Sequence, residues 1–556
     1  MRNINLRYVD ETYDEQDLLK TYKTHYPDNF NFGYDIVDDI AVNDPKRRAL
    51  LWCNDKGDEK TFTFADIKRL SDKAANYLTS MNIKKGDMVL VVLKHSYQFW
   101  YVSVALCKIG AIMIPATYML TKHDVEYRVN AASVRAVICI SEESVAQAFD
   151  DAENIPTLEI KIMVNGKRNG WDNFDEGTEK ASDKWERVPT NAKELMLIYF
   201  TSGTSGNPKM SMHDFSYPIG HIMTAKHWHC VVPDGLHFSV ADTGWAKAAW
   251  GKLYGQWIME AGLFVYEYDK WEPSEVLDLI GKYKITTLCC PPTMFRFFIN
   301  SGLEGHDLTS LTNTNIAGEA LSPDTFSTWY KATGLKLMEG FGQSETPVII
   351  GNLRGMIPKP GSMGKPTPQY RVDLIDDKGN SCSPGVNGEI VININPHPAG
   401  ITTGYYRDKT KTKELQFGGY HHTGDIAWKD EDGYFWYVGR NDDIIKSSGY
   451  RISPFEIESV LMEHPAVLEC AVTGVPDEIR GQLVKATIVL REKYESSDAL
   501  KKELQNYVKH ETAPYKYPRA LEFVKELPKS ISGKVKRITI RNADIEKNKQ
   551  ISGEKK

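Results

Sequence analysis

The sequence lacks the signals that mark three large classes of protein. Its eight cysteines are scattered and form no C-x-x-C pair, so neither a disulfide framework nor a zinc site is indicated. No segment approaches the roughly 18 uninterrupted apolar residues of a membrane-spanning helix, and the polar stretch Met1 to Lys20 has no apolar signal-peptide core. The net charge of -6 argues against a general nucleic-acid binder. We therefore expect a cytoplasmic protein with free thiols, no integral membrane association and no nucleic-acid partner.

What the chain does contain is an alternation of strand-like and helix-like segments. Thr63 and Asp66 form a potential capping box, and Ile67 and Leu70 begin a helical apolar pattern behind it. We expect strands at 88–93, 111–115, 136–140, 263–266 and 285–290, with helices at 97–109 and 272–283. Such alternation implies parallel βαβ units. The sequence therefore predicts an α/β fold whose large N-terminal domain contains two βαβ-type subdomains.

The last third of the chain differs in the length of its apolar segments and in the frequency of turn-forming residues. Short segments between residues 361 and 431, broken by Gly, Pro and Asp, predict a smaller β-rich subdomain. Beyond a Gly-Asp-rich turn at 439–443, the run Ser453 to Glu456 supplies a helix cap and an N1 proline. Strands are expected at 468–475, 484–490 and 521–524, with a helix near 498–508. We therefore divide the chain into domains 1–440 and 441–556, the second a small α+β domain with a disordered tail from Glu546 onward.

One glycine-rich run resembles a phosphate-holding loop attached to the end of a buried strand. The apolar segment Leu195 to Phe200 is followed by Thr201, Ser202, Gly203, Thr204, Ser205, Gly206, Asn207, Pro208 and Lys209. Glycines let the backbone approach an anion, while the hydroxyls and the lysine offer donors and positive charge. The Walker pattern is excluded because Asn207 follows Gly206. A cluster of this kind is often only a turn, so its context must decide.

Four further segments offer groups that a nucleotide site needs, although each alone is weak. Gly340 to Thr346 brackets a carboxylate and two hydroxyls that suit hydrated Mg²⁺ and a phosphate, but it also fits a surface turn. His422 to Asp425 offers a carboxylate for ribose hydroxyls, yet Thr-Gly-Asp is common in hairpins. Gly439 to Asp443 contains a cation that would equally serve a structural ion pair. Pro528 to Lys534 ends in a lysine that, taken alone, is expected to be solvated.

Taken together, the order and spacing of these segments resemble the acyl-adenylate-forming superfamily over nearly the whole chain. This superfamily includes acyl-CoA synthetases, peptide-synthetase adenylation domains and luciferases. The segment Lys446 to Glu458 is similar to that of acyl-CoA synthetases. The segments Val240 to Trp245 and Tyr515 to Arg519 are similar to those of the medium-chain acyl-CoA synthetase branch.

The resemblance implies an ATP-dependent acid–thiol ligase that converts a carboxylic acid, ATP and CoA to acyl-CoA, AMP and diphosphate. The first half-reaction forms an acyl-adenylate in the N-terminal AMP-binding domain. The implied catalytic residues are Lys534, Thr346 and Glu345, with Glu345 as the Mg²⁺ ligand. The implied ATP- and AMP-binding residues are Thr201 to Lys209, Gly318, Glu319, Ala320, Phe341, Gly342, Gln343, Ser344, Glu345, Thr346, Asp425 and Arg440.

The same resemblance implies that the C-terminal domain is a mobile lid. It would rotate about a hinge at Asp442, withdraw Lys534 and present a different face to CoA. The implied CoA-binding residues are Lys446, Ser448, Gly449, Tyr450, Arg451, Arg480, Lys509 and Tyr517. For Arg480 and Lys509, simple solvation at the surface is the competing interpretation.

The acid is expected to bind between the phosphate loop and Gly318. Trp245, Lys247 and Trp250 are the candidate lining residues, with Trp257 as a further tryptophan that fits either a pocket or a core. Lys247 would either extend to solvent or narrow the acyl tunnel, favouring short, medium-chain, branched or aryl acids.

Two other functions stay open. An adenylating enzyme that loads a carrier protein, or a luciferase-like oxygenase, would share the first half-reaction but should lack the CoA face. A non-catalytic nucleotide-binding protein would be expected to lack a key group, yet Lys209, Glu345, Asp425, Arg440 and Lys534 are all present. The sequence leaves the acid, the pathway, the oligomeric state and any acylation of Lys534 undetermined.

Overall fold

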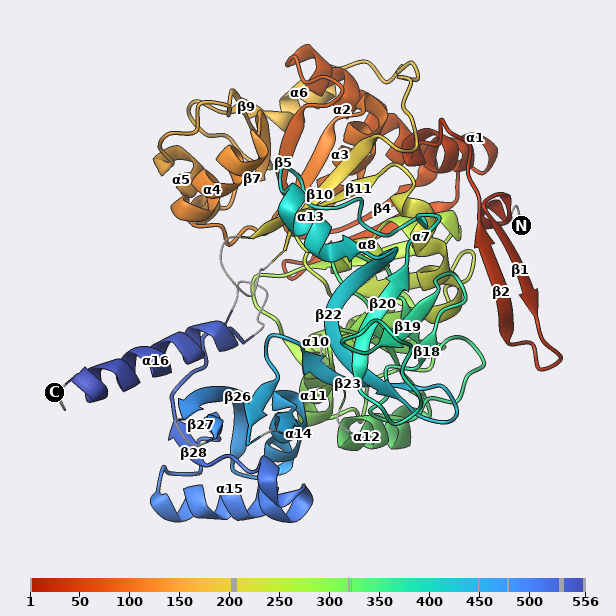
Figure 1. Cartoon of the computed structure of the whole chain (residues 1–556). Coiled ribbons are helices and arrows are strands. Elements are labelled where there is room, and N and C mark those ends of the chain that lie inside the picture. Colours follow the sequence, from red (N-terminus) through yellow and green to blue (C-terminus); the bar gives the residue numbers. More distant parts are fainter. Residues whose placement is uncertain are drawn as a thin grey trace. The chain divides into compact units, whose positions relative to one another are not determined.

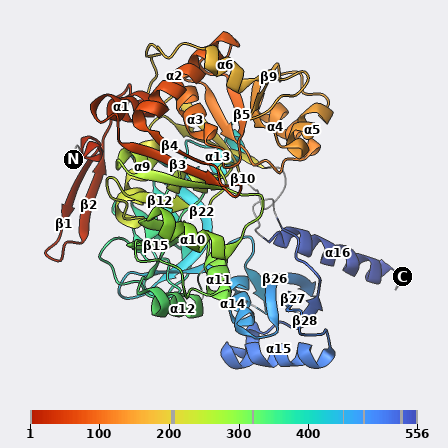
Figure 2. The ribbon, with the colours of Figure 1, turned by 180° about the vertical axis from the view of Figure 1, so that it is seen from behind.

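The computed structural model describes residues 3–201, 208–318, 321, 323–448, 450–477, 480–529 and 535–553. The described chain forms two compact units. The first unit contains residues 3–201, 208–372 and 392–421, and the second contains residues 373–391 and the chain from 422 onward. Figures 1 and 2 show the elements of each unit from opposite sides.

The first unit contains two large sheets and a hairpin. Among the described residues, seven strands form one sheet in the order β11 (Lys209–Asp214), β10 (Leu195–Thr201), β6 (Ile112–Pro115), β5 (Met88–Val92), β7 (Ala136–Ile140), β8 (Ile160–Val164) and β9 (Asp172–Asn173). All neighbouring pairs are parallel except β10 and β11. The hairpin pairs β1 (Val9–Tyr13) with β2 (Leu19–Thr24).

Nine described strands form the second sheet. Their order is β18 (Lys365–Pro366), β17 (Ile350–Gly351), β16 (Leu337–Phe341), β15 (Asn313–Ile316), β14 (Thr287–Cys290), β12 (Leu236–Ser239), β13 (Gly262–Glu267), β3 (Arg48–Asn54) and β4 (Glu59–Thr63). The strands from β16 to β3 are parallel, and antiparallel strands flank them. The predicted βαβ organisation is confirmed.

Helices cover these sheets, as Figures 1 and 2 show. They are α1 (Asp39–Asn43), α2 (Phe64–Ser80), α3 (Gln98–Ile109), α4 (Lys122–Ala132), α5 (Glu143–Asp151), α6 (Phe174–Lys180), α7 (Tyr217–Met223), α8 (Lys247–Gly251), α9 (Tyr254–Ile258), α10 (Pro273–Tyr283), α11 (Pro292–Ser301), α12 (Pro323–Thr333) and α13 (Lys409–Leu415). The central strands β5 and β7 are buried at every position. Parallel strands covered on both faces explain why their sequences are continuously apolar.

The second unit contains a β-rich part and an α+β part. The first part includes most of β19 (Val372–Ile375), β20 (Gly388–Asn393) and β22 (Tyr420–Lys429), and all of β23 (Phe435–Arg440). The short β21 (Gln416–Phe417), which belongs to the first unit, pairs with the start of β22. The second part has a sheet of β25 (Tyr450–Ile452), β24 (Ile445–Ser447), β27 (Gly481–Leu490), β26 (Val467–Asp477) and β28 (Ala520–Phe523). Its helices are α14 (Pro454–Glu463), α15 (Asp498–Glu511) and α16 (Arg537–Gly553). The proposed boundary at 440/441 stays a prediction.

The α+β sheet buries both of its faces. Val472 on β26 shares an apolar cluster with Leu461 of α14 and Leu504 of α15. The neighbouring Ala471 packs with Ile540 of α16 in a separate cluster. Because successive strand residues point to opposite faces, α16 covers the face that α14 and α15 leave.

For residues 546–553 the expectation of a disordered tail was wrong, and residues 554–556 lie outside the described residues. Residues 546–553 continue α16, which begins at Arg537. Ile540 is buried, Asp544 binds Lys485, and Lys547 binds Glu522 at 3.0 Å. These contacts hold the helix on the sheet.

Local sequence signals also set helix starts. The Thr63 hydroxyl accepts from the Asp66 N–H at 3.2 Å, and the Asp66 carboxylate accepts from the Thr63 N–H at 3.1 Å. This confirms the predicted capping box of α2. Among the described helices, none is both long and apolar enough to cross a membrane.

We expect Thr63→Ala to lower the free energy of unfolding by about 1 kcal/mol, because the Asp66 N–H at the start of α2 loses the hydroxyl that accepts its hydrogen bond. Urea unfolding monitored by circular dichroism measures this change. Thr79→Ala alters the same residue type at an exposed position of α2 and should change stability by less than about 0.5 kcal/mol. Equal losses in the two variants would contradict the capping contribution.

Candidate active site

The two residues at the ends of the predicted phosphate loop, Thr201 and Lys209, lie opposite each other on neighbouring strands. Thr201 ends β10 and is the cross-strand partner of Lys209, the first residue of β11. The six residues Ser202, Gly203, Thr204, Ser205, Gly206 and Asn207 lie outside the described residues. The carbonyl of Pro208 accepts a hydrogen bond from Tyr127 at 2.8 Å. The antiparallel pairing therefore fixes both ends of the predicted loop at one edge of the sheet.

A tyrosine joins two groups that the sequence placed far apart. The Lys209 ammonium lies 5.2 Å from the centre of the Tyr405 ring. The Tyr405 hydroxyl donates to the Glu345 carboxylate at 2.9 Å, and both side chains are largely buried. Sequence reasoning missed Tyr405, because its place depends on an isolated bridge between Ser211 and Tyr405. No local motif indicates such a long-range pairing.

The segment 340–346 is a tightly held turn. The Gln343 N–H donates to the Thr346 hydroxyl at 2.9 Å, and the Thr346 hydroxyl donates to the Pro347 carbonyl at 2.9 Å. The Ser344 carbonyl accepts from His213 at 2.9 Å. Thr346 is fully buried and Glu345 is 8% exposed, so the alternative of a solvated surface turn is wrong. Phe341 ends β16 and leads directly into this turn.

Gly342 permits a close approach of Trp250. A Cβ atom at position 342 would lie 2.2 Å from the Pro347 carbonyl oxygen and 2.7 Å from the Trp250 ring. The Trp250 ring also makes an edge contact with Trp228, at 6.2 Å between centres. Only glycine fits here. The turn that carries Glu345 and Thr346 is thus in contact with one of the candidate acyl-pocket residues.

Lys247 does not extend to open solvent. It begins α8, is only partly exposed, and its ammonium donates to the Ala317 carbonyl. This contact lies beside Gly318, whose φ of 95° requires glycine. Glu319 and Ala320 lie outside the described residues. Of the tryptophans, Trp245 is partly buried, whereas Trp257 donates to the Ala49 carbonyl in the core and lines no surface.

In the second unit, Asp425 and Arg440 are cross-strand partners on β22 and β23. Their charged atoms are 3.5 Å apart, and Arg440 also donates to the Thr423 carbonyl at 2.9 Å. The Tyr437 hydroxyl donates to Asp425 at 2.9 Å. Asp442, the expected hinge residue, accepts from Arg440 at 3.4 Å. The predicted ribose-binding carboxylate and its companion cation are therefore together.

The electrostatic surroundings keep Arg440 and Tyr437 each in one protonation state. Burial opposes the charge of Arg440, but Asp425 and Asp442 outweigh it and raise its pKa further above the ordinary value. Burial, together with the charge of Asp425, raises the pKa of Tyr437 well above its usual range. Arg440 therefore stays charged and Tyr437 stays a hydrogen-bond donor. The Arg440–Asp425 ion pair is also what a purely structural role of Arg440 would predict.

The predicted CoA residues fall into two groups on the α+β part. Lys446 on β24 pairs with Arg451 on β25, and the Arg480 guanidinium donates to the Ser448 hydroxyl at 3.2 Å. The Tyr450 ring stacks on Tyr515 at 4.1 Å. In the other group, the Lys509 ammonium lies 4.1 Å from the centre of the Tyr517 ring. Gly449 and Lys534 lie outside the described residues.

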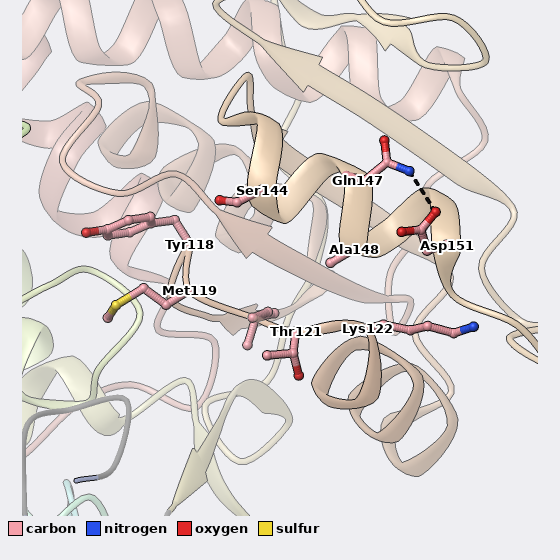
Figure 3. Close-up of a pocket in the computed structure, with 9 residues that line it drawn as sticks. Tyr118, Met119, Thr121, Lys122, Ser144, Gln147, Ala148 and Asp151 are labelled. Carbon is pink, nitrogen blue, oxygen red and sulfur yellow. Dashed lines mark hydrogen bonds between the residues drawn. The ribbon is translucent and has the colours of Figure 1, made fainter.

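A cavity of about 350 Å³ lies between α5 and the segment that leads into α4 (Figure 3). Its described lining is Tyr118, Met119, Leu120, Thr121, Lys122, Ser144, Gln147, Ala148 and Asp151. Lys122 is the cation among these residues, and it pairs with Glu153 at 3.1 Å. Gln147 donates to Asp151 at 2.6 Å. A lining with one paired cation and a carboxylate does not suit a polyphosphate.

Two family models match the chain. The AMP-binding enzyme model matches residues 37–406, and the AMP-binding enzyme C-terminal domain model matches residues 456–534. The chain belongs to the AMP-binding enzyme family. The first match contains the Lys209–Tyr405–Glu345 arrangement, and the second begins within α14. These matches cover the segments 201–209, 340–346 and 528–534, whereas 422–425 and 439–443 lie between the two matched ranges.

Curated relatives and solved structures agree with this membership. The chain is 40% identical to the human protein "Acyl-coenzyme A synthetase ACSM3, mitochondrial", covering 95% of this chain and 92% of the relative. It is 42% identical to human "Acyl-coenzyme A synthetase ACSM5, mitochondrial", covering 93% and 91%. The solved anthranilate CoA ligase AuaEII, in complex with anthranoyl-AMP, is 28% identical with a TM-score of 0.83, covering 93% and 98%.

A further carboxyl is buried next to the turn at 340–346. Glu339 is 5% exposed on β16, directly before the turn that carries Glu345. Its Oε2 atom has no hydrogen-bond partner among the described residues. Burial raises its pKa from 4.5 to about 8. The folded protein therefore favours the protonated form of this carboxyl near neutral pH.

We expect Glu339→Gln to flatten the pH dependence of stability. The folded-state pKa lies above the unfolded value, so the stability associated with protonation is lost as pH rises from about 4.5 through about 8. The free energy of unfolding of the wild type should fall across this window more than that of the variant. Urea unfolding at several pH values measures both. Glu304→Gln, at an exposed position, should behave as the wild type; parallel profiles for all three proteins would contradict the assignment.

Proposed function

We propose that this protein is an ATP-dependent acyl-CoA synthetase that converts a carboxylic acid, ATP and CoA to acyl-CoA, AMP and diphosphate through an acyl-adenylate. The observation that carries the proposal is its near-full-length relationship to acyl-CoA synthetases. The gathering of Lys209, Glu345 and Tyr405 at one sheet edge supports it. The proposed substrates are a short- or medium-chain, branched or aryl acid, ATP and CoA.

Charge is the main obstacle to the first half-reaction, because the carboxylate and the triphosphate are both anions. Lys209 would contribute positive charge to the leaving phosphates, and Thr346 would contact the α-phosphate. The buried turn that holds Thr346 fixes its backbone before substrate arrives, which is the arrangement expected for preorganised stabilisation of charge. A base is not needed for this step, because the attacking carboxylate is already ionised.

Glu345 fits the role of a Mg²⁺ ligand. Mg²⁺ usually takes one or two protein carboxylates together with substrate phosphates and water. The Tyr405 hydroxyl orients the Glu345 carboxylate. When bound, Mg²⁺ would neutralise charge on the phosphate oxygens.

The ribose and the second half-reaction involve the later part of the chain. Asp425 would accept hydrogen bonds from the ribose hydroxyls, with its carboxylate oriented by Tyr437 and Arg440. Lys534 would contact the substrate carboxylate and the α-phosphate. We propose the domain limits 1–440 and 441–556, with a hinge at Asp442 that lets the C-terminal domain replace Lys534 by the CoA face. That face would include Lys446, Ser448, Gly449, Tyr450, Arg451, Arg480, Lys509 and Tyr517.

The acid pocket would be bordered by Trp245, Lys247 and Trp250. The Trp250 ring lies against Gly342, and the Lys247 ammonium donates to the Ala317 carbonyl. We expect these two side chains to narrow the pocket. A narrow pocket favours a short, branched or flat acid over a long chain. The cytoplasmic location also stays a proposal, since the names of the curated relatives are those of mitochondrial proteins.

Carboxylate-dependent release of diphosphate, measured with and without CoA over a panel of straight, branched and aryl acids, tests the function. We expect diphosphate and acyl-CoA in equal amounts when CoA is present. Adenylate without thioester would instead favour an enzyme that loads a carrier protein. The absence of turnover with every acid would favour a non-catalytic nucleotide-binding protein.

Lys534→Ala should separate the two half-reactions. We expect acyl-adenylate formation to fall by about a hundredfold or more, because the charge that stabilises its transition state is lost. Conversion of supplied acyl-adenylate by CoA should be largely retained. Lys536→Ala changes an exposed lysine two residues away and should leave both steps intact. Equal loss of the two steps in Lys534→Ala would refute this division of labour.

Lys247→Ala should lengthen the preferred acyl chain, because it removes the side chain that reaches across to Ala317. The ratio of kcat/KM values for a series of straight-chain acids measures the preference. Each additional methylene that the pocket accepts should contribute about 0.8 kcal/mol. Lys270→Ala, which removes an exposed lysine paired with Glu272, is the matched control. An unchanged chain-length profile would exclude Lys247 from selectivity.

A further inference from the structure

Five buried polar side chains lie together in the first unit, and we call them the polar cluster. None of them is more than 5% exposed. In each, one polar atom has no hydrogen-bond partner among the described residues, although a buried polar group without a partner is costly. These atoms are His229 Nε2, His237 Nε2, Ser239 Oγ, Trp250 Nε1 and Gln256 Oε1.

Direct contacts join the members of the polar cluster. The ring centres of His229 and His237 are 4.4 Å apart. The Gln256 amide donates to His229 Nδ1 and to the Trp250 carbonyl, both at 3.0 Å. His237 and Ser239 are two residues apart on β12, so their side chains lie on the same face of the sheet. The unpartnered atoms therefore belong to one place in the fold.

Gly251 brings the backbone of α8 close to two of these atoms. A Cβ atom at position 251 would lie 3.1 Å from His237 Nε2 and 3.1 Å from Ser239 Oγ. Both atoms thus face the same point beside the glycine. Because glycine has no side chain, it leaves them uncovered on this side.

The polar cluster is rich in donors and carries no net charge. The Gln256 amide can only donate, so His229 Nδ1 accepts and the proton of the neutral ring lies on Nε2. The indole Nε1 of Trp250 is also a donor. Burial lowers the pKa of His229 well below its ordinary value, and burial with the charge of Lys252 lowers that of His237 to about 3. Neutral donors suit an uncharged oxygen, whereas a buried carboxylate would need a cation as its partner.

We propose that the polar cluster binds an uncharged oxygen, of a hydroxyl or a carbonyl group, on the acyl chain of the substrate acid, and so selects hydroxy and oxo acids. This inference rests on the proposed function and on the proposed acid pocket. Trp250 connects the two places, because its ring lies against Gly342 while its indole N–H belongs to the polar cluster. A substrate oxygen would give the unpartnered atoms a partner, and a methyl group in its place would not.

The first test compares acids that differ only by the exchange of an oxygen function for a methyl group. The pairs are 3-hydroxybutanoate with 3-methylbutanoate, 4-hydroxybenzoate with 4-methylbenzoate, and 4-oxopentanoate with 4-methylpentanoate. Diphosphate release in the presence of ATP and CoA gives kcat/KM for each acid. We expect the wild type to favour the oxygen-bearing acid of at least one pair by about tenfold or more.

Ser239→Ala and His237→Leu remove one unpartnered atom each. We expect either substitution to lower the preference within that pair by about threefold to tenfold, as the loss of one hydrogen bond to substrate implies. Activity with the methyl-bearing acid should be retained. Ser103→Ala is the matched control, because Ser103 is a buried serine whose hydroxyl already donates to the Phe99 carbonyl at 2.6 Å. It should leave the preference unchanged.

Thermal unfolding separates binding of substrate from a structural role. Ser239→Ala should unfold at or above the wild-type temperature, since its hydroxyl has no partner among the described residues, whereas Ser103→Ala should unfold at a lower temperature. A wild type that favours the methyl-bearing acid of every pair would overturn the inference, as would an unchanged preference in both Ser239→Ala and His237→Leu. A wild type that releases no diphosphate with any acid would overturn the proposed function itself, and the inference with it.

Discussion

Parallel strands can form a stable sheet only when both faces are covered, and this constraint organises the first unit. The continuous burial of β5 and β7 requires helices on both sides, and the connections between strands and helices must then emerge at the sheet edges. Because the covered faces of the sheet are apolar, the polar groups of these connections lie in the loops at the ends of the strands. Ligands bind for the same reason beyond the carboxyl ends of strands in open α/β sheets. The turn after β16 is placed in this way.

The buried carboxylates at both parts of the site have hydrogen-bond or ion-pair partners. Glu345 is buried but receives a hydrogen bond from Tyr405, whose ring also lies beneath Lys209. Asp425 is buried but has Arg440 and Tyr437 as partners. A buried charge without a partner would shift its pKa and neutralise. Glu339 illustrates that outcome, since burial without a hydrogen bond to its Oε2 atom raises its pKa. The contrast distinguishes carboxylates suited to binding from one that stays protonated.

In the second unit, helices cover both faces of one sheet. The alternation of side chains along β26 places Val472 against α14 and α15 and Ala471 against α16. The helix α16 is thus attached by apolar contacts on one side. Its polar sequence led to the wrong expectation of a disordered tail. Composition alone does not reveal that Ile540 is buried or that Asp544 has Lys485 as a partner.

The sequence by itself determined the elements, the family resemblance and the residue types of the site. The capping box at Thr63 and the buried strands follow from patterns within a few residues, which is why they could be read locally. Only the tertiary structure decided which distant residues meet. Tyr405 joins Lys209 to Glu345, Trp250 lies on Gly342, and Arg541 holds the Asp442 carbonyl. These contacts depend on the register and packing of elements that are far apart in the chain. The periodicity of apolar residues in the sequence does not reveal such long-range pairings.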